Sequence, residues 1–67
     1  MKALGENLKS YRKKRKLTQK TLAELCNMDR SYLTDIELGN RNITLLHLKQ
    51  IAEALKVSPG SLLKGAR

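Results

Sequence analysis

The chain has little of the chemistry that small proteins use to cross-link a fold or to catalyse a reaction. Its 67 residues include one cysteine, Cys26, and one histidine, His47. A single cysteine excludes an internal disulfide, and one cysteine with one histidine cannot complete a structural zinc site. The sequence shows neither a nucleophile–base pairing nor a glycine-rich phosphate loop. We therefore expect no catalytic residue, no metal and no cofactor, with Cys26 acting as buried packing.

Long hydrophobic runs are also missing. No window approaches the roughly 18 apolar residues that a membrane span needs, and the N-terminus shows no apolar signal core. Alternating strand patterns, repeats and low-complexity segments are absent as well. We expect a cytoplasmic protein without a membrane partner, and a free thiol agrees with a reducing compartment.

Acidic residues are scarce relative to basic ones. Six Asp and Glu stand against fourteen Lys and Arg, which gives a net charge of +8. This imbalance implies a polyanionic partner, either nucleic acid or an anionic membrane surface. The basic run over residues 9–16 is either a helix end matched to its dipole or a surface for phosphate contact and steering. The first helix carries only a thin apolar stripe, which favours nucleic acid over a membrane.

The length limits the chain to one domain, residues 1–67, with a small core. A chain of about 60 residues buries only about 60% of its unfolded surface and is marginally stable alone. Such folds need a disulfide, a metal or a partner subunit. Because the first two are excluded, we expect a homodimer.

Apolar spacing and capping residues predict an all-α fold of five short helices. Gly5 lies inside the first helix and costs about 1 kcal/mol relative to alanine, so we expect the first turn to fray. Asn27 falls in a turn that tolerates a left-handed residue, and Gly39 ends the third helix. The expected N-caps are Thr18, Asp29, Thr44 and Ser58. The expected helices cover residues 2–16, 19–25 or 26, 30–38, 45–56 and 59 to about 64.

Residues 18–38 predict a helix-turn-helix, because two capped helices are joined by a three-residue turn. At about 100° per residue, the segment 30–38 has two distinct faces. Apolar side chains gather on the inner face, which holds Tyr32, Leu33 and Ile36. The outer face holds Arg30, Ser31, Thr34, Asp35 and Leu38. Arg, Ser, Thr and Asp supply the donors and acceptors that read base edges in a major groove.

The sequence resembles the Cro/cI-type (XRE) helix-turn-helix family over nearly its whole length. The shared positions are Leu17-Thr18-Gln19, Leu22-Ala23, Ser31-Tyr32, Ile36-Glu37, Gly39-Asn40-Arg41 and Ile51-Ala52-x-Ala54-Leu55. The segments 29–32, 35–37 and 41–44 are also similar to the controller proteins of restriction–modification systems. The resemblance implies a compact lambda-repressor-like domain and a transcriptional regulator that binds a pseudo-palindromic operator as a homodimer. It implies double-stranded DNA and a second copy as partners, with RNA polymerase as a further candidate partner.

Four residues of the third helix are expected to read bases. Arg30 lies in the first turn, and its planar fork can bond guanine O6 and N7 together, although a phosphate contact is the alternative. Ser31 can contact a base or a phosphate, and Thr34 a thymine methyl or a phosphate. Asp35 can accept from cytosine N4, but an orienting role toward Arg30 or Arg41 is favoured because a carboxylate repels phosphate.

Five other residues are expected to contact the DNA backbone. Gln19 resembles the family residue whose amide meets a phosphate at a helix N-terminus. The Tyr32 hydroxyl bonds either a phosphate or solvent. Arg41 and Asn42 follow the third helix, and Arg41 can alternatively enter a narrow minor groove. His47 lies near the start of the fourth helix, where it either reaches a phosphate or is simply solvated.

Other residues are expected to be structural. The resemblance places Arg12 against Glu37 as an ion pair that fixes the third helix on the scaffold. Leu46, Pro59 and Leu62 are candidates for a dimer interface, since they need not all be buried in a monomer, and the resemblance adds Val57. Isolated apolar surface residues are the alternative interpretation.

A second functional class shares this fold. An antitoxin-type module that binds a toxin protein is the alternative to a transcriptional regulator. The chain ends within a few residues of Leu63, so we expect no disordered tail that could wrap a toxin. Retrieval of a second protein with the chain would favour this alternative.

Overall fold

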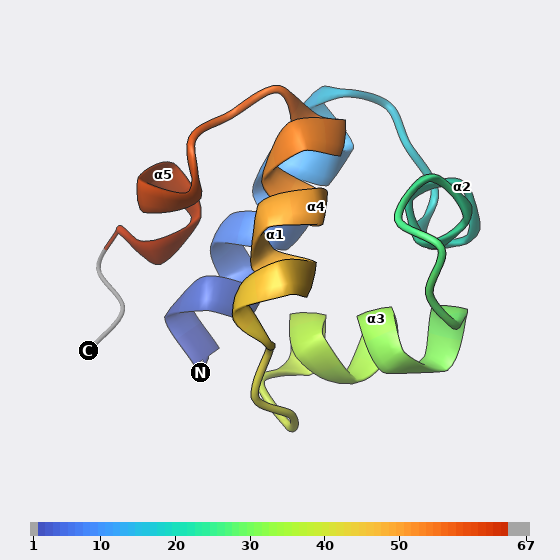
Figure 1. Ribbon diagram of the computed structural model, residues 1–67, viewed down its shortest axis with the longest axis horizontal. Coiled ribbons are helices and arrows are strands. Elements are labelled where there is room, and N and C mark those ends of the chain that lie inside the picture. Colours follow the sequence, from blue (N-terminus) through green and yellow to red (C-terminus); the bar gives the residue numbers. More distant parts are fainter. Residues whose placement is uncertain (1, 65–67) are drawn as a thin grey trace.

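The computed structural model describes residues 2–64, which fold into five α-helices (Figure 1). They are α1 (Lys2–Lys14), α2 (Gln19–Leu25), α3 (Arg30–Leu38), α4 (Leu45–Leu55) and α5 (Pro59–Leu63). All regular secondary structure between residues 2 and 64 is helical, so the predicted five-helix, all-α fold is confirmed. The α1 helix ends before the predicted residue 16, because Lys16 adopts a left-handed φ of 57°.

Polar side chains cap most of the helices as predicted. In three helices a hydroxyl accepts a hydrogen bond from the backbone N–H three residues further along, and these caps are Thr18, Thr44 and Ser58. Asp29 departs from the prediction. It occupies the N-cap position of α3, but among the described residues its side chain makes no capping hydrogen bond. Its carboxylate therefore acts on α3 only through its charge near the positive end of the helix.

Left-handed residues form the turns on both sides of α3. Asn27 has φ 53° in the turn between α2 and α3, and Gly39 has φ 79° directly after α3. Both conformations agree with the sequence prediction. These turns set α2 at an angle to α3 and send the chain from α3 back into the body of the protein (Figure 1).

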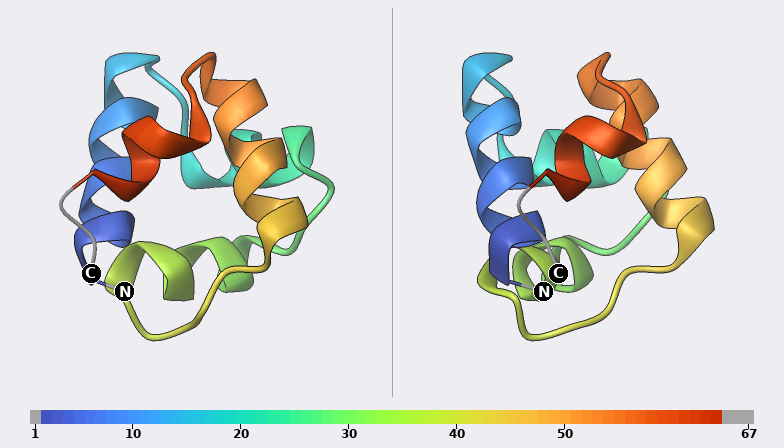
Figure 2. Two further views of the ribbon diagram at one scale, coloured as in Figure 1. Left: turned by 60° about the vertical axis from the view of Figure 1, so that its left-hand side comes forward. Right: turned by 90° about the vertical axis from the view of Figure 1, so that its left-hand side faces the viewer.

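Within residues 2–64 the helices enclose one apolar core. α1 packs against α3 and α5, and α2 packs against α3 and α4. Both views in Figure 2 place α3 and the loop after it at the lower end of the molecule, with α5 higher. The core consists of Leu4, Leu8, Leu22, Ala23, Cys26, Leu33, Ile36, Leu48, Ile51, Ala52, Leu55 and Leu62. α3 thus rests on a packed scaffold at one end of the protein.

Gly5 is required by packing, which the sequence analysis did not anticipate. It is buried where α1 approaches the end of α3. A Cβ atom at this position would lie 2.5 Å from the carbonyl oxygen of Ile36, and nearer still to that of Glu37. Real Cβ atoms do not approach backbone oxygens so closely, so the absent side chain permits the contact between α1 and α3. Gly5 therefore has a packing role in addition to its low helix propensity.

The helices are short compared with a bilayer. A helix that crosses a membrane needs about 20 predominantly apolar residues. Within residues 2–64, no helix reaches the length and apolar content of a membrane span.

Candidate nucleic-acid interface

The outer face of α3 is accessible, and its inner face is firmly anchored. Leu33 and Ile36 are completely buried in the core. Arg30 and Ser31 are exposed in the first turn, and Thr34 is half-buried one turn further along. The two faces predicted from the helical periodicity are therefore present. The residues expected to read bases are accessible or partly accessible on one side of this helix.

A buried ion pair holds α3 on α1. The Arg12 Nε donates to Glu37 Oε2 at 2.7 Å, and Arg12 Nη2 donates to Glu37 Oε1 at 3.2 Å. The third nitrogen, Nη1, donates to the Leu17 carbonyl at 2.8 Å, which also ties down the turn before α2. Arg12 and Glu37 are only 8% and 7% exposed. The ion pair that the family resemblance implied is thus present, and the paired fork satisfies both charges.

The side chain of Gln19 extends this pair toward the surface. Its Nε2 donates to Glu37 Oε1 at 3.0 Å, and its Oε1 accepts from Thr34 Oγ1 at 3.1 Å. The Thr34 hydroxyl also lies 2.9 Å from the carbonyl oxygen of Arg30. The sequence predicts that Gln19 and Thr34 face DNA but gives no sign that they bond each other. Their partners are 15 and 18 residues away in sequence, so no local pattern reveals them.

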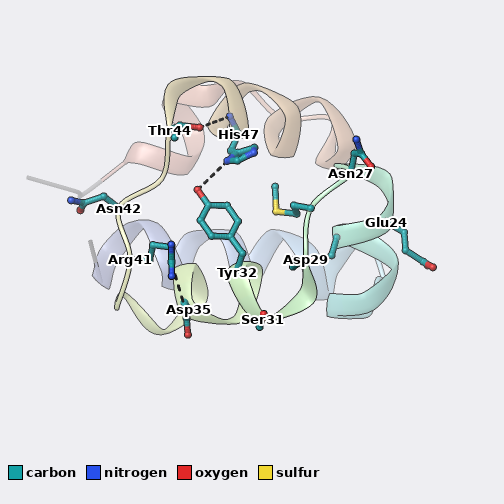
Figure 3. Close-up of a pocket in the computed structure, with 12 residues that line it drawn as sticks. Glu24, Asn27, Asp29, Ser31, Tyr32, Asp35, Arg41, Asn42, Thr44 and His47 are labelled. Carbon is teal, nitrogen blue, oxygen red and sulfur yellow. Dashed lines mark hydrogen bonds and ion pairs between the residues drawn. The ribbon is translucent and has the colours of Figure 1, made fainter.

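A second group of side chains links α3 to the following loop and to α4. Arg41 Nε lies 3.8 Å from Asp35 Oδ2, and its guanidinium sits over the Tyr32 ring, 5.3 Å from the centroid. The Tyr32 hydroxyl and His47 Nδ1 are hydrogen-bonded at 3.0 Å, with the two rings meeting edge to face. Figure 3 shows these four residues around one surface groove, with the Tyr32 side chain reaching from α3 toward His47 of α4. We refer to Asp35, Arg41, Tyr32 and His47 as the groove cluster.

The groove cluster assigns partners to residues that were expected to meet DNA directly. The Asp35 carboxylate faces Arg41 at 3.8 Å, an arrangement that agrees with the orienting role predicted for it. Tyr32 and His47 share their hydrogen bond, so one polar atom of each is occupied in the free protein. Asn42 is exposed in the loop beside Arg41 and lines the same groove. The groove therefore presents a cation and an amide next to the outer face of α3, together with the carboxylates of Glu24, Asp29 and Asp35.

The residues expected at a dimer interface fall into different environments. Leu46 is 64% exposed on α4, and Pro59 is exposed at the start of α5. Val57 is half-buried and packs against the core. Leu62 is completely buried within the single chain, so its assignment to an interface is wrong. A hydrogen bond from α1 also holds α5 in place, because Asn7 Nδ2 donates to the Leu62 carbonyl at 2.9 Å.

Positive charge gathers at the end of α1 and in the turn that follows it. Lys13, Lys14, Arg15 and Lys16 are all exposed there.

The thiol of Cys26 is 3% exposed in the core, and burial raises its pKa above the ordinary value. The Cys26 thiol therefore stays protonated and contributes to core packing, and it does not act as a nucleophile. Within residues 2–64 no group of three or more His, Cys, Asp or Glu side chains is placed to hold a metal ion.

Comparison with known proteins decides the family. Residues 8–62 match the family model described as helix-turn-helix. The chain belongs to the XRE-type helix-turn-helix family. In this family, α2 and α3 are the two helices of the motif, and α3 is the recognition helix, the one such folds insert into the major groove.

Curated relatives of this helix-turn-helix protein include regulators of different kinds. The immunity repressor protein of Bacillus phage phi105 is 44% identical over 59 residues, which cover 88% of this chain and 41% of that protein. The control protein C.SmaI of Serratia marcescens is 42% identical over 60 residues, covering 90% of this chain and 71% of that protein. The chain thus spans less than half the length of the phage repressor.

Solved structures of family members superpose closely on the fold. The restriction-modification controller protein C.AhdI from Aeromonas hydrophila gives a TM-score of 0.88 with 38% identity, covering 91% of this chain and 92% of that chain. SinR, the master regulator for biofilm formation, was solved in complex with DNA. It gives a TM-score of 0.86 with 33% identity, covering 90% of this chain and 97% of that chain.

Proposed function

We propose that this helix-turn-helix protein is a transcriptional regulator that recognises a specific double-stranded DNA sequence with α3. One observation carries the proposal. The first turn of α3 exposes Arg30 and Ser31, while Leu33 and Ile36 anchor the same helix in the core. A helix fixed on one face and polar on the other fits the width of a major groove. The similar SinR was solved in complex with DNA, which supports DNA as the ligand.

Within this proposal Arg30 makes the principal base contact. Its guanidinium fork can donate to O6 and N7 of one guanine, a pairing that distinguishes guanine from the other bases. Ser31 lies beside it on the same face and contributes a secondary contact, whereas the Thr34 hydroxyl is bonded within the protein to Gln19 and to the Arg30 carbonyl. Asp35 acts through Arg41, whose guanidinium it faces at 3.8 Å, rather than by approaching phosphates.

Backbone contacts flank the recognition helix on both sides. Gln19 stands at the first position of α2, where the helix dipole favours an anion. Arg41, Asn42, Tyr32 and His47 line the groove on the other side of α3. Contacts to phosphates fix the register of the protein on the duplex but do not read sequence. The net charge of +8 adds a sequence-independent attraction.

We infer that two copies bind together. Helix-turn-helix dimers read half-sites about 34 Å apart, one turn of B-DNA. The longest extent of this domain is 28 Å, so two copies fit side by side at that spacing. Leu46 on α4 and Pro59 on α5 are exposed apolar residues and the proposed contacts, together with Val57, which lies in the loop between these two helices. The operator is then a pseudo-palindrome.

The more specific form of the proposal is a restriction–modification controller. C.SmaI, C.BamHI and C.MunI are control proteins that match most of this chain, and C.AhdI superposes on it. A controller that regulates its own expression binds DNA directly upstream of its gene. Binding to that segment in preference to other DNA supports this form, and binding elsewhere only would favour a repressor of other genes. If the controller activates transcription, RNA polymerase is its proposed protein partner.

The experiment that tests the proposal separates specificity from affinity. Duplexes bound by the wild type are selected from a random pool, and binding is compared with that of a scrambled duplex at two salt concentrations. Arg30→Ala should relax preference at one base pair per half-site, losing about 1–3 kcal/mol on the selected duplex only. Gln19→Ala should weaken binding to both duplexes and flatten the salt dependence. Equal affinity of the wild type for every duplex would contradict the proposal.

A further inference from the structure

The buried ion pair is continuous with the outer face of the motif through hydrogen bonds. Four side chains connect in the order Arg12, Glu37, Gln19 and Thr34, with successive donor–acceptor distances of 2.7, 3.0 and 3.1 Å. Arg12 and Glu37 are buried, whereas Gln19 and Thr34 are half-buried. The chain therefore runs from the interior of the protein to the surface proposed to face DNA.

The chemistry of Glu37 fixes the orientation of the Gln19 amide in this chain. An ionised carboxylate can only accept hydrogen bonds, so the amide nitrogen of Gln19 must face Glu37. The amide oxygen must then face Thr34, whose single hydroxyl proton is shared between this oxygen at 3.1 Å and the carbonyl oxygen of Arg30 at 2.9 Å. A glutamine that is free in solvent has neither its amide orientation nor its three rotatable bonds fixed. Here both are determined by partners at 3.0 and 3.1 Å.

We propose that Glu37 is a positioning residue for DNA binding, because it orients the Gln19 amide and leaves the second Nε2–H of Gln19 for a phosphate. Thr34 completes the arrangement from the outer side. The inference rests on the proposed function and adds a second role to the carboxylate that holds α3 on α1. An amide ordered before binding loses less conformational freedom on contact, which increases affinity without adding a contact.

Thr34 provides the first test, because its side chain is half-buried and a threonine-to-valine change conserves its shape. Thr34→Val removes the donor to Gln19 and should weaken binding about two- to tenfold on selected and scrambled duplexes alike, the range for one hydrogen bond. Thr34→Ser, which restores a hydroxyl, should recover most of that loss. In a Gln19→Ala background, Thr34→Val should have no further effect. Additive effects, or a loss confined to one base pair, would mean that Thr34 contacts DNA itself and would overturn the inference.

Glu37 itself is tested against a control that shares its structural role. Glu37→Gln keeps the size of the side chain but no longer forces the Gln19 nitrogen inward. Arg12→Lys weakens the same ion pair by removing the fork, yet keeps the carboxylate. Measured well below both unfolding temperatures, Glu37→Gln should lose several-fold more DNA affinity than Arg12→Lys. Equal losses in the two variants would show that Glu37 acts only through stability.

A measurement on the free protein keeps the inference separate from the function. The side-chain amide of Gln19 should show restricted motion in nitrogen-15 relaxation, and Thr34→Val and Glu37→Gln should release it. The side-chain amide of Gln50, on α4, is the internal reference and should not change. If the Gln19 amide is already mobile in the wild type, the inference fails even though specific DNA binding persists. If the wild type prefers no duplex, the proposed function and the inference both fail.

Discussion

Two groups of side chains join α3 to its neighbours, and they do so under opposite conditions. Arg12 and Glu37 meet at 2.7 Å with side chains 10% and 3% exposed. Arg41 and Asp35 meet at 3.8 Å with side chains 56% and 43% exposed. Both pairs join an arginine from outside α3 to a carboxylate of α3. The comparison shows that burial, and not residue type, decides whether such a pair holds the fold or remains available to a ligand.

The physical reason lies in solvent screening. A buried charge that loses its partner is left unsolvated, so removing one member of a buried pair is strongly destabilising. An exposed charge regains water when its partner is removed, and the net effect on stability is small. The same exposure leaves Arg41 free to exchange Asp35 for a phosphate. The buried pair therefore supports the recognition helix, whereas the groove cluster can respond to DNA.

The largest expected effect comes from breaking the buried pair. Arg12→Ala leaves Glu37 buried with Gln19 as a neutral donor and should lower the free energy of unfolding by about 3–5 kcal/mol. Urea unfolding followed by circular dichroism measures the loss. Asp35→Asn is the matched control on the exposed pair, and it should change stability by less than about 1 kcal/mol. Similar losses for the two variants would remove the distinction between the pairs.

The second-largest loss of stability should come from disturbing the close contact between α1 and α3. Gly5→Ala forces a methyl group against the carbonyl oxygens of Ile36 and Glu37 and should destabilise by about 1–3 kcal/mol, as overpacking does. Gly60 is the control, because a Cβ there meets nothing nearer than Ser58 Oγ at 3.8 Å. Thermal unfolding should leave Gly60→Ala near the wild type. A neutral Gly5→Ala would show that the two helices can separate without loss.

The hydrogen bond inside the groove cluster should contribute less to the free energy of unfolding than either of these contacts. Tyr32→Phe removes the hydroxyl that pairs with His47 while keeping the ring beneath Arg41, so stability should fall by about 0.5–1.5 kcal/mol. Urea unfolding measures it, with Tyr11→Phe on α1 as the comparison. A loss as large as that of Arg12→Ala would place the groove cluster among the supports of the fold.

The smallest effect on stability should accompany a gain in DNA binding. Asp35→Asn removes a negative charge from the outer face and releases Arg41, so affinity for selected and scrambled duplexes should rise together. Fluorescence anisotropy at low and high salt measures the gain, which should shrink as salt screens the phosphates. Weaker binding confined to the selected duplex would instead show that Asp35 accepts a hydrogen bond from a base.

Local features of the fold were predictable from sequence because they depend on neighbouring residues. Thr18, Thr44 and Ser58 are hydroxyl residues that form caps directly before their helices, and Gly39 supplies the left-handed residue that ends α3. Lys16 was missed at the end of α1, because it adopts φ 57° without the glycine that usually marks such a position.

Features that depend on packing between helices were harder to predict from the sequence. The five-residue helix α5 is too short to define which leucine faces inward, so Leu62 was placed at the surface although it is completely buried. Gly5 gave a propensity signal but no indication that α3 would lie against it. The Arg12–Glu37 pair was expected from family resemblance alone. The bonds from Gln19 to Glu37 and Thr34 join separate helices and have no signature in the local sequence.

The central claim is that Arg30 lies in the major groove against a guanine. Dimethyl sulfate methylates guanine N7, an atom of the major groove that Arg30 would cover. On a selected operator, the wild type should protect one guanine in each half-site, and Arg30→Ala should restore methylation at that guanine while the remaining footprint stays in place. Identical protection by the two proteins, or none at all, would contradict the account.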